Sequence, residues 1–300
     1  MSFIKRKPKF QLFHVVNGLL MLLMMFVMVY PFWNTIAISL NDAVDSIRGN
    51  IYLWPRVFTW YNYESLFATN KLINAFFVSL SKTVLVTILN VFFSALAAYI
   101  LSRREFFLRK PLTVYLVATM YVSAGLIPQY FNYRDFGLIN NYLVYILPGM
   151  LGVFNVIVIR TFIHTLPESL AESARIDGAG DFRIFLRIII PLCKPVLATV
   201  ALWVAVGAWN EWFDTYIFAS SKQELSTLQF EMMKLLSSSM VQSGSQTPGL
   251  MANSSSGSNM ITPTSIRSAI SIIAALPIIF VYPFLQKYFI AGLHLGGVKG

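Results

Sequence analysis

Apolar residues run through this chain in long blocks with few charges, separated by shorter polar segments. A helix needs about 20 such residues to cross the roughly 30 Å hydrocarbon layer of a bilayer. Six blocks approach that length and predict transmembrane helices over residues 12–33, 83–101, 112–131, 142–163, 195–213 and 268–285. The pattern therefore predicts an all-α integral membrane protein with six transmembrane helices.

The first block follows four basic residues, so a cleaved signal peptide has to be considered. Its apolar run is longer than a typical signal-peptide core, and it ends in "VYPFWN" without a small-residue cleavage site. We expect an uncleaved first helix.

These blocks define a basic N-terminus, a six-helix domain and a short tail, at residues 1–11, 12–285 and 286–300. The segments between helices are expected to be two long outer loops, a short outer turn and an inner loop, at 34–82, 214–267, 132–141 and 164–194. The first long loop contains an amphipathic or re-entrant stretch, "WYNYESLFATNKLINAFFVSL". The second is rich in Ser, Gly and Asn at about 236–259, which favours a flexible surface segment.

Charge is scarce and unevenly placed. Only 12% of the residues are charged, against 56% hydrophobic, and the formal net charge is +10. With the N-terminus inside, the inner segments hold 14 Lys and Arg in 67 residues and the outer segments 8 in 113. This asymmetry places both termini in the cytoplasm. It also explains the positive net charge without a nucleic-acid partner. The sequence has no array of basic residues interleaved with aromatic residues, which would indicate binding to RNA or DNA.

Ionisable residues near the helices allow two interpretations. Lys82 and Arg267 lie at the outer ends of predicted helices, where we expect their charges to reach the membrane interface. Glu211 and Asp214, in "WNEWFD", belong either to an interfacial aromatic belt or to a polar cavity, and the sequence leaves both open. The single cysteine, Cys193, is expected to pack as a small residue. The three histidines lack metal-ligand spacing, so no metal site is predicted.

The inner loop is shaped unusually for a connector. "TLPE" has the form of a capping box, with Thr165 as N-cap and Glu168 reaching back. On the helix that follows, a face of small or apolar residues would admit close approach of another protein, and Glu172 and Arg175 are spaced to pair. That face consists of Leu170, Ala171, Ala174 and Gly178.

A sharp turn is predicted at Gly178 and Gly180, because glycine accepts positive φ at little cost. A second helix then starts near Asp181, with one apolar side and one side carrying Arg183 and Arg187. The apolar side consists of Phe182, Phe185, Ile188 and Ile189. Either this loop is a plain amphipathic connector or it is a docking element, and its shaping favours docking.

"AESARIDGAGDFRIFLRIIIPLCKPVLA" closely resembles the EAA motif of ABC importer permeases, E-A-A-x-x-x-G followed by I-x-L-P. Residues that match are Glu172, Ala174, Gly178, Ile188, Ile190 and Pro191, while Ser173 replaces an alanine. "GLHLGGVKG" is similar to the carbohydrate-uptake class that includes the smaller maltose permease subunit. "SAGLIPQY", "LPGMLGVFNVIVIRTF" and "YPFLQKYF" resemble permeases for complex or uronic-acid-containing oligosaccharides, although Ala124 stands where a second glycine is expected.

This resemblance implies that the cytoplasmic loop at 165–182 forms coupling helices that seat in a groove of a separate ATPase. The implied docking residues are Glu168, Ala171, Glu172, Ala174, Arg175, Asp177, Gly178, Ala179 and Phe182. It also implies that the tail reaches between the ATPase subunits, through Gly296, Gly297 and Lys299. The chain has no G-x-x-x-x-G-K-[ST] phosphate loop, so ATP and Mg²⁺ would be bound by the ATPase dimer and no cofactor by this chain.

The further implied partners are a second permease subunit, an extracytoplasmic solute-binding protein and an oligosaccharide, all at a bacterial cell membrane. Transport would proceed by alternating access. Sugar sites combine aromatic faces with amides and carboxylates. The residues that we expect along the path are Tyr121, Gln129, Asn155, Trp209, Asn210 and Glu211, each of which has an alternative packing role.

The sequence offers three alternative functions. An ion-coupled secondary transporter would show intramembrane carboxylates and repeated broken helices, and it leaves the inner loop unexplained. A membrane enzyme would need a catalytic motif such as H-E-x-x-H or G-x-S-x-G, and the chain contains neither. An ABC permease for a non-sugar solute remains the alternative within the class.

Overall fold

The computed structural model describes residues 12–68, 70–245 and 262–296, and in these ranges it contains helices and no β-strand. The all-helical prediction is therefore confirmed. The chain divides into two compact units, residues 1–68 with 238–273 and residues 69–237 with 274–300. Two helices, α13 (Leu228–Ser245) and α14 (Pro263–Gly296), contribute to both units.

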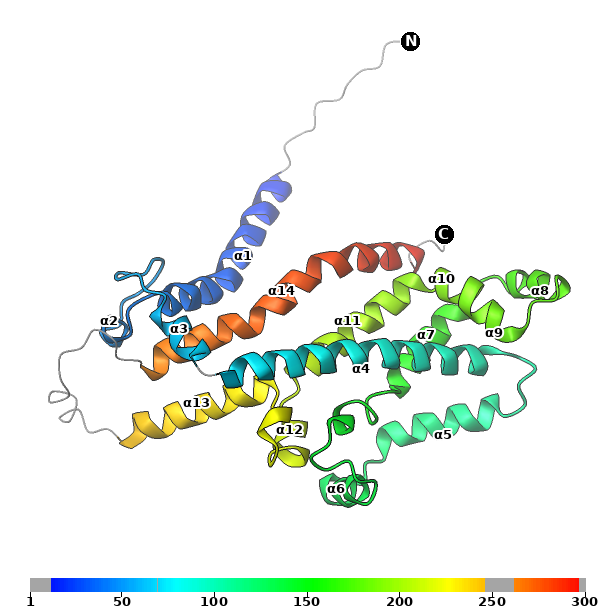
Figure 1. Cartoon of the computed structure of the whole chain (residues 1–300). Helices are drawn as coiled ribbons and strands as arrows, with labels where there is room; N and C mark the ends of the chain where they lie inside the picture. Colours follow the sequence, from blue (N-terminus) through cyan, green and yellow to red (C-terminus); the bar gives the residue numbers. More distant parts are fainter. Residues whose placement is uncertain (1–11, 69, 246–261, 297–300) are drawn as a thin grey trace, which may run out of the picture. The chain divides into compact units, whose positions relative to one another are not determined.

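Unit 1 begins with α1 (Leu12–Ser39), a helix whose apolar side chains are mostly exposed (blue in Figure 1). It is long and apolar enough to cross a membrane and extends six residues beyond the predicted end at 33. Two short helices follow, α2 (Ala43–Ile47) and α3 (Tyr61–Phe67). The expected loop at 34–82 is therefore partly helical.

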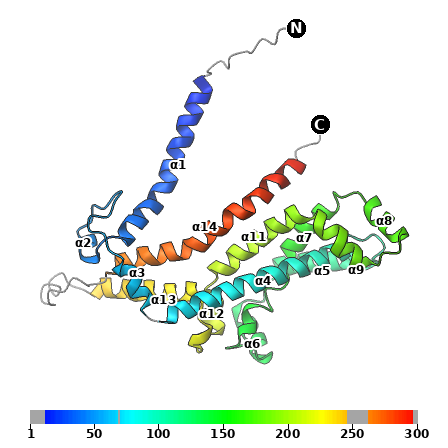
Figure 2. The same cartoon turned by 45° about the horizontal axis from the view of Figure 1, so that its top comes forward.

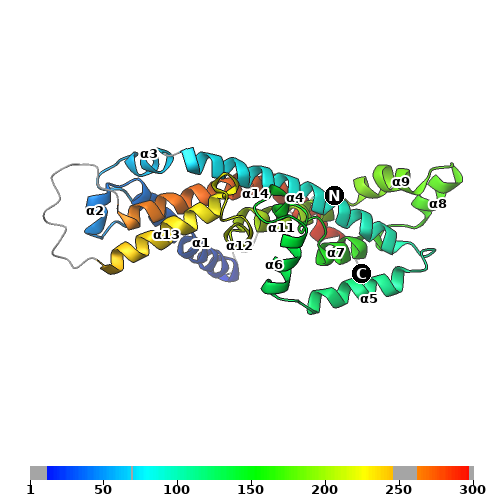
Figure 3. The same ribbon diagram turned by 60° about the horizontal axis from the view of Figure 1, so that its bottom comes forward.

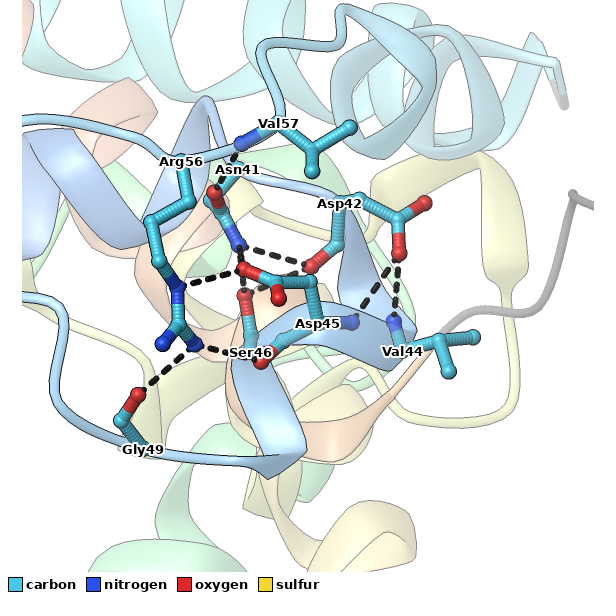
Figure 4. A network of polar contacts seen from close by, with 8 residues as sticks. All are labelled: Asn41, Asp42, Val44, Asp45, Ser46, Gly49, Arg56 and Val57. Atoms are coloured by element: carbon cyan, nitrogen blue, oxygen red, sulfur yellow. Dashed lines mark hydrogen bonds and ion pairs between the residues drawn. The ribbon is translucent and has the colours of Figure 1, made fainter.

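A polar network orders the segment between α1 and α3 (Figure 4). The Asp42 carboxylate caps α2 by accepting from the backbone N–H groups of Val44 and Asp45, both at 3.0 Å. The Asp45 carboxylate accepts in turn from Asn41 at 3.0 Å and from Arg56 at 2.9 Å. These two donors hold the pKa of Asp45 below its usual value.

Unit 2 is built around α4 (Asn70–Ser102), which packs beside α7 (Val153–Ile163) and α11 (Lys194–Asn210) (Figure 2). Small residues of α4 let the helices approach closely, and branched residues of α7 and α11 fill the space between them. The buried contacts include Ala95, Ala98, Val156, Ile159 and Val200. Cys193 is buried in the same core, as predicted.

Two predicted spans are not continuous helices. The block at 112–131 is divided into α5 (Arg109–Tyr121) and α6 (Leu126–Asp135) (Figure 3). The chain direction bends by 117° between these two helices. Gly125, with φ +86°, precedes α6 and adopts a conformation that other residues rarely reach. In the described chain two helices are long and apolar enough to cross a membrane, or up to four if each bent pair counts once. The six-span count stays a prediction.

The block at 142–163 contains a short 3-10 helix, η1 (Tyr142–Tyr145), an irregular segment, and only then α7. Side chains of α4 satisfy the irregular backbone. Asn90 donates to the Gly149 carbonyl at 2.7 Å, and Ser94 accepts from the Gly152 N–H at 3.3 Å. Irregular backbone is tolerated at membrane depth only where protein or water supplies such partners.

The second long loop is also more helical than expected. It contains α12 (Phe213–Phe218), the short η3 (Gln223–Leu225) and α13. Of the Ser-rich stretch at 236–259, residues up to Ser245 are helical and residues 246–261 lie outside the described ranges.

We expect Asn90→Ala to destabilise unit 2, because it leaves the Gly149 carbonyl and the Asn155 amide without their partner. Leaving a buried polar group unsatisfied costs about 1–3 kcal/mol. The thermal midpoint of unfolding in detergent should fall by a few degrees. Asn132→Ala, at an exposed position, is the control. Equal midpoints for the two variants would contradict the role assigned to Asn90.

Candidate functional site

The loop between α7 and α11 folds into two helices joined by a glycine turn (Figure 1). α8 (Ser169–Ile176) has Asp177 as its C-cap, and α9 (Asp181–Ile184) begins after Gly180. Gly178 has φ +78°, and the Ala179 N–H donates back to the Ala174 carbonyl at 2.9 Å. The predicted start of the second helix and the positive φ at Gly178 are confirmed, whereas Gly180 has an ordinary extended backbone with φ −70°.

After α9 the chain continues through a π-helical turn, η2 (Phe185–Ile189), and α10 (Ile190–Leu192) into α11. The helical segment Asp181–Leu192 and the helix Lys194–Asn210, on either side of Cys193, are bent by 81° relative to each other. Phe185 and Ile189 are buried and Ile188 packs beside them, whereas Phe182 is 59% exposed. Three of the four residues of the predicted apolar side are therefore on the core side.

The small-residue face is oriented differently from the prediction. Ala171 is buried and Ala174 packs against the same core cluster, so both face the chain's own interior. Spacing along a helix shows that residues share a face but not what that face contacts. Leu170 and Gly178 remain exposed.

The opposite surface of α8 is open. Ile176 is 87% exposed, although isoleucine is among the residue types most often buried. Other exposed residues of the loop include Glu168, Glu172, Ser173, Asp177, Gly178, Phe182 and Arg183. Of the predicted docking residues, Ala171 is buried, and Ala174, Arg175 and Ala179 are half-buried.

Both predicted side-chain pairings within this loop are wrong. The Thr165 hydroxyl donates to the Phe162 carbonyl at 2.7 Å, and α8 begins later, with Glu168 as an N-cap that makes no side-chain capping bond. In the described chain no ion pair joins Glu172 to Arg175. Arg175 instead contacts Glu105, beyond the end of α4, at 2.9 Å.

A cavity of about 310 Å³ lies between the end of α4 and the start of α8. Its polar lining is mostly ionisable and includes Arg103, Arg104, Glu105, His164 and Glu168. Partial burial and the neighbouring Arg160 hold the pKa of His164 below its usual value. The cavity gives this end of unit 2 a charged interior surface.

The residues expected along a substrate path are not brought together by hydrogen bonds in the described chain. Tyr121 and Gln129 are exposed on either side of the α5–α6 break. The Asn155 amide donates to Asn90 at 2.8 Å, and the buried Trp209 indole donates to the Ala274 carbonyl at 3.1 Å. Asn155 and Trp209 are thus engaged in packing.

Asn210 and Glu211 mark the end of α11. The exposed Asn210 side chain accepts from Gln229 at 3.1 Å. The Glu211 carboxylate accepts from the N–H groups of Phe213 and Asp214 at 2.8 and 3.3 Å, and so caps α12. Glu211 is therefore engaged at the break between two helices.

Lys82 was assigned wrongly to an interface. It lies within α4 and is 2% exposed; its ammonium donates to the Glu211 carbonyl at 3.2 Å and lies 5.0 Å from the centre of the Tyr145 ring. The start of the helix at Asn70, rather than 83, places it inside. The neighbouring polar residues in "SLSKT" were the available signal. Arg267 is exposed.

Asp214 lies beside this buried charge. Burial raises the pKa of the Asp214 carboxyl, Glu211 raises it further, and Lys82 opposes both effects. In the described residues, no hydrogen bond reaches its carboxylate.

For the predicted tail, Gly296 is the last residue of α14, and Gly297 and Lys299 lie outside the described ranges.

Comparison with known proteins adds three kinds of relative. The family described as "Binding-protein-dependent transport system inner membrane component" matches residues 83–294. The chain is 35% identical to a polygalacturonan/rhamnogalacturonan transport system permease protein of Bacillus subtilis (strain 168), over 97% of this chain and all of that protein. It is 30% identical to a melibiose/raffinose/stachyose import permease of the same organism, over 90% of this chain and 91% of that protein.

One solved structure, described as a bacterial ABC transporter involved in the import of the acidic polysaccharide alginate, contains a chain with a similar fold. The TM-score is 0.82 and the identity 27%, over 94% of this chain and all of that chain.

The raised pKa of Asp214 predicts a pH dependence. A carboxyl whose folded pKa exceeds its unfolded pKa stabilises the fold below the unfolded value, and this stability is lost as pH rises through the folded pKa. Wild-type protein should therefore lose stability as pH rises from about 4 through that pKa, and Asp214→Asn should lose less. Thermal midpoints measured across this range test it, with Asp135→Asn as an exposed control. Parallel profiles for wild type and Asp214→Asn would contradict the assignment.

Proposed function

Because the chain belongs to the family of binding-protein-dependent transport system inner membrane components, we propose that it is a permease subunit of an ATP-binding-cassette importer for an oligosaccharide. The observation that carries the proposal is the inner loop. Its buried side is fixed to α4, while its opposite side presents the exposed Ile176 on a short helix. Such a helix suits a groove on another protein.

In this proposal the loop at 164–194 is cytoplasmic and α8 docks on a separate ATPase, which binds ATP and Mg²⁺. The docking contacts come from the exposed residues around Ile176 rather than from the small-residue face. Ala171, Ala174 and Ala179 then act by positioning α8. The tail residues Gly296, Gly297 and Lys299 are proposed to reach between the ATPase subunits.

Transport would proceed by alternating access. ATP binding brings two ATPase subunits together and moves the docked α8 helices, which favours one conformation of the membrane helices over the other. A ligand shifts such an equilibrium only through its different affinities for the two conformations. The chain would form half of the pathway with a second permease subunit. An extracytoplasmic solute-binding protein would deliver the cargo, and both termini would be cytoplasmic.

An oligosaccharide is the proposed cargo because the compared permeases are named for such sugars or for polysaccharides. The alginate importer makes an acidic chain the first variant to test. Of the expected path residues, Tyr121, Gln129 and Asn210 have exposed side chains. Asn155, Trp209 and Glu211 would shape the path through the packing they support.

We expect Ile176→Glu to abolish retention of the ATPase, because it places a charge at the centre of an apolar contact. Ile176 is 87% exposed, so the protein's own packing is little affected. The complex is co-expressed with its neighbouring permease and candidate ATPase, and the ATPase that co-purifies is quantified. Ile176→Leu is the matched control and should retain it. Wild-type amounts of ATPase on Ile176→Glu would refute docking through α8.

The cargo is tested in proteoliposomes that contain the complete importer and its binding protein. We expect ATP hydrolysis to be stimulated by an oligosaccharide, and we compare neutral galactosides with oligogalacturonates and oligoalginates of equal length. Stimulation by one sugar class names the cargo. If no sugar stimulates hydrolysis while an amino acid or a metal ion does, the carbohydrate assignment is wrong.

A further inference from the structure

Four charged side chains form a closed ring where the end of α4 meets the loop between α7 and α11. Arg103 lies 3.1 Å from Asp181 and 3.8 Å from Glu105. Arg175 lies 2.9 Å from Glu105 and 3.6 Å from Asp181. Charges alternate around this ring, so each carboxylate contacts two guanidinium groups. We refer to Arg103, Glu105, Arg175 and Asp181 as the charge ring.

The charge ring is attached to the core of unit 2 through Tyr99. The Arg103 guanidinium lies 5.3 Å from the centre of the Tyr99 ring, and the Tyr99 hydroxyl contacts Asp181 at 3.4 Å. Tyr99 itself packs on the buried Phe185, with ring centres 5.5 Å apart. One side of the charge ring therefore lies on the buried side chains Tyr99 of α4 and Phe185 of η2.

The charge ring also spans the turn between the two helices of the loop. Arg175 is in α8, before Gly178, and Asp181 is the first residue of α9, after Gly180. A Cβ atom at Gly178 or Gly180 would meet nothing within 4 Å, so packing does not restrain the turn there. A second contact, Arg104 to Glu168 at 3.3 Å, connects the residues after α4 to the residue before α8.

We propose that the charge ring holds α8 in a fixed orientation relative to α4, so that a displacement of α8 reaches α4 instead of being absorbed by the Gly178 turn. Its four members are positioning residues, and the inference rests on the proposed docking of α8. Arg175 thereby serves α4 rather than the ATPase. Two guanidinium forks that each bridge two carboxylates restrict orientation more than a single pair does.

The two carboxylates of the charge ring are exposed, so they can be neutralised with little effect on folding. The side chains of Asp181 and Glu105 are 69% and 64% exposed. Ion pairs this exposed add little to stability, so neutral variants should fold. A role in orientation can then be separated from a role in folding.

The experiment measures three quantities for Glu105→Gln, Asp181→Asn and the double variant in the complete importer. These are the ATPase that co-purifies, the rate of ATP hydrolysis and the sugar taken up per ATP. We expect ATPase retention to be unchanged and sugar per ATP to fall by about 2- to 30-fold, the range for residues that modulate coupling between sites. The double variant should be more affected than either single variant, because each single variant leaves the other carboxylate in contact with both guanidinium groups.

Two controls complete the design. Asp135→Asn removes an equally exposed carboxylate, 67% exposed and 3.0 Å from Arg134, and should keep the wild-type ratio. Asp181→Glu keeps the charge and should largely preserve coupling. A wild-type ratio in the double variant would overturn the proposal. Loss of the ATPase from the neutral variants would also overturn it, because these residues would then be docking contacts. If the wild-type complex itself fails to retain an ATPase, the proposed function fails instead.

Discussion

Every break in a helix at membrane depth leaves backbone groups that need partners, and in unit 2 one long helix supplies many of them. α4 carries polar side chains at intervals, and four of them meet the end of another element or an irregular segment. Ser79 accepts from the Leu228 N–H at the start of α13 at 2.8 Å, and Lys82 donates to the Glu211 carbonyl at the end of α11. Asn90 and Ser94 satisfy the irregular segment before α7. These four polar positions of α4 are therefore structural, and the broken elements depend on them.

The same helix leads directly into the charge ring. After Ser94, towards the C-terminal end of α4, its contacts become apolar. Ala95 and Ala98 pack against α7 and α11, and Tyr99 packs against Phe185. It then ends at Ser102, immediately before Arg103. One continuous helix thus connects the loop between α7 and α11 with the breaks at the opposite end of unit 2. Close-packed contacts of this kind transmit displacement instead of absorbing it. This continuity is the physical basis for expecting a movement of α8 to reach the α11–α12 break.

Sequence reasoning was most successful where a residue type determines local conformation. Gly178 marks a turn because its φ is positive, and Arg183 and Arg187 are exposed on the polar side of the second helix. It failed where the answer depends on neighbours distant in sequence. A hydropathy profile averages the composition of a window, so it does not reveal the bend before α6. Residue spacing along α8 identifies the residues that share a face, but it does not show that Ala171 faces the core. The Thr165 hydroxyl had a competing acceptor at the end of α7, which the capping pattern ignores. Lys82 was misplaced because the start of α4 was set too late.

The α11–α12 break shows how charged groups can be retained in an apolar setting by their contacts within the fold. Glu211 ends one helix with its carbonyl, which accepts from Lys82, and begins the next with its carboxylate, which accepts from two backbone N–H groups. An apolar residue at 82 would leave that carbonyl unpaired, and an apolar residue at 211 would leave two N–H groups uncapped. Because the carbonyl and the carboxylate of Glu211 both accept hydrogen bonds within the fold, the geometry of the break accounts for an acidic residue at this position. Of the two acids in "WNEWFD", Glu211 is thus explained by the fold alone.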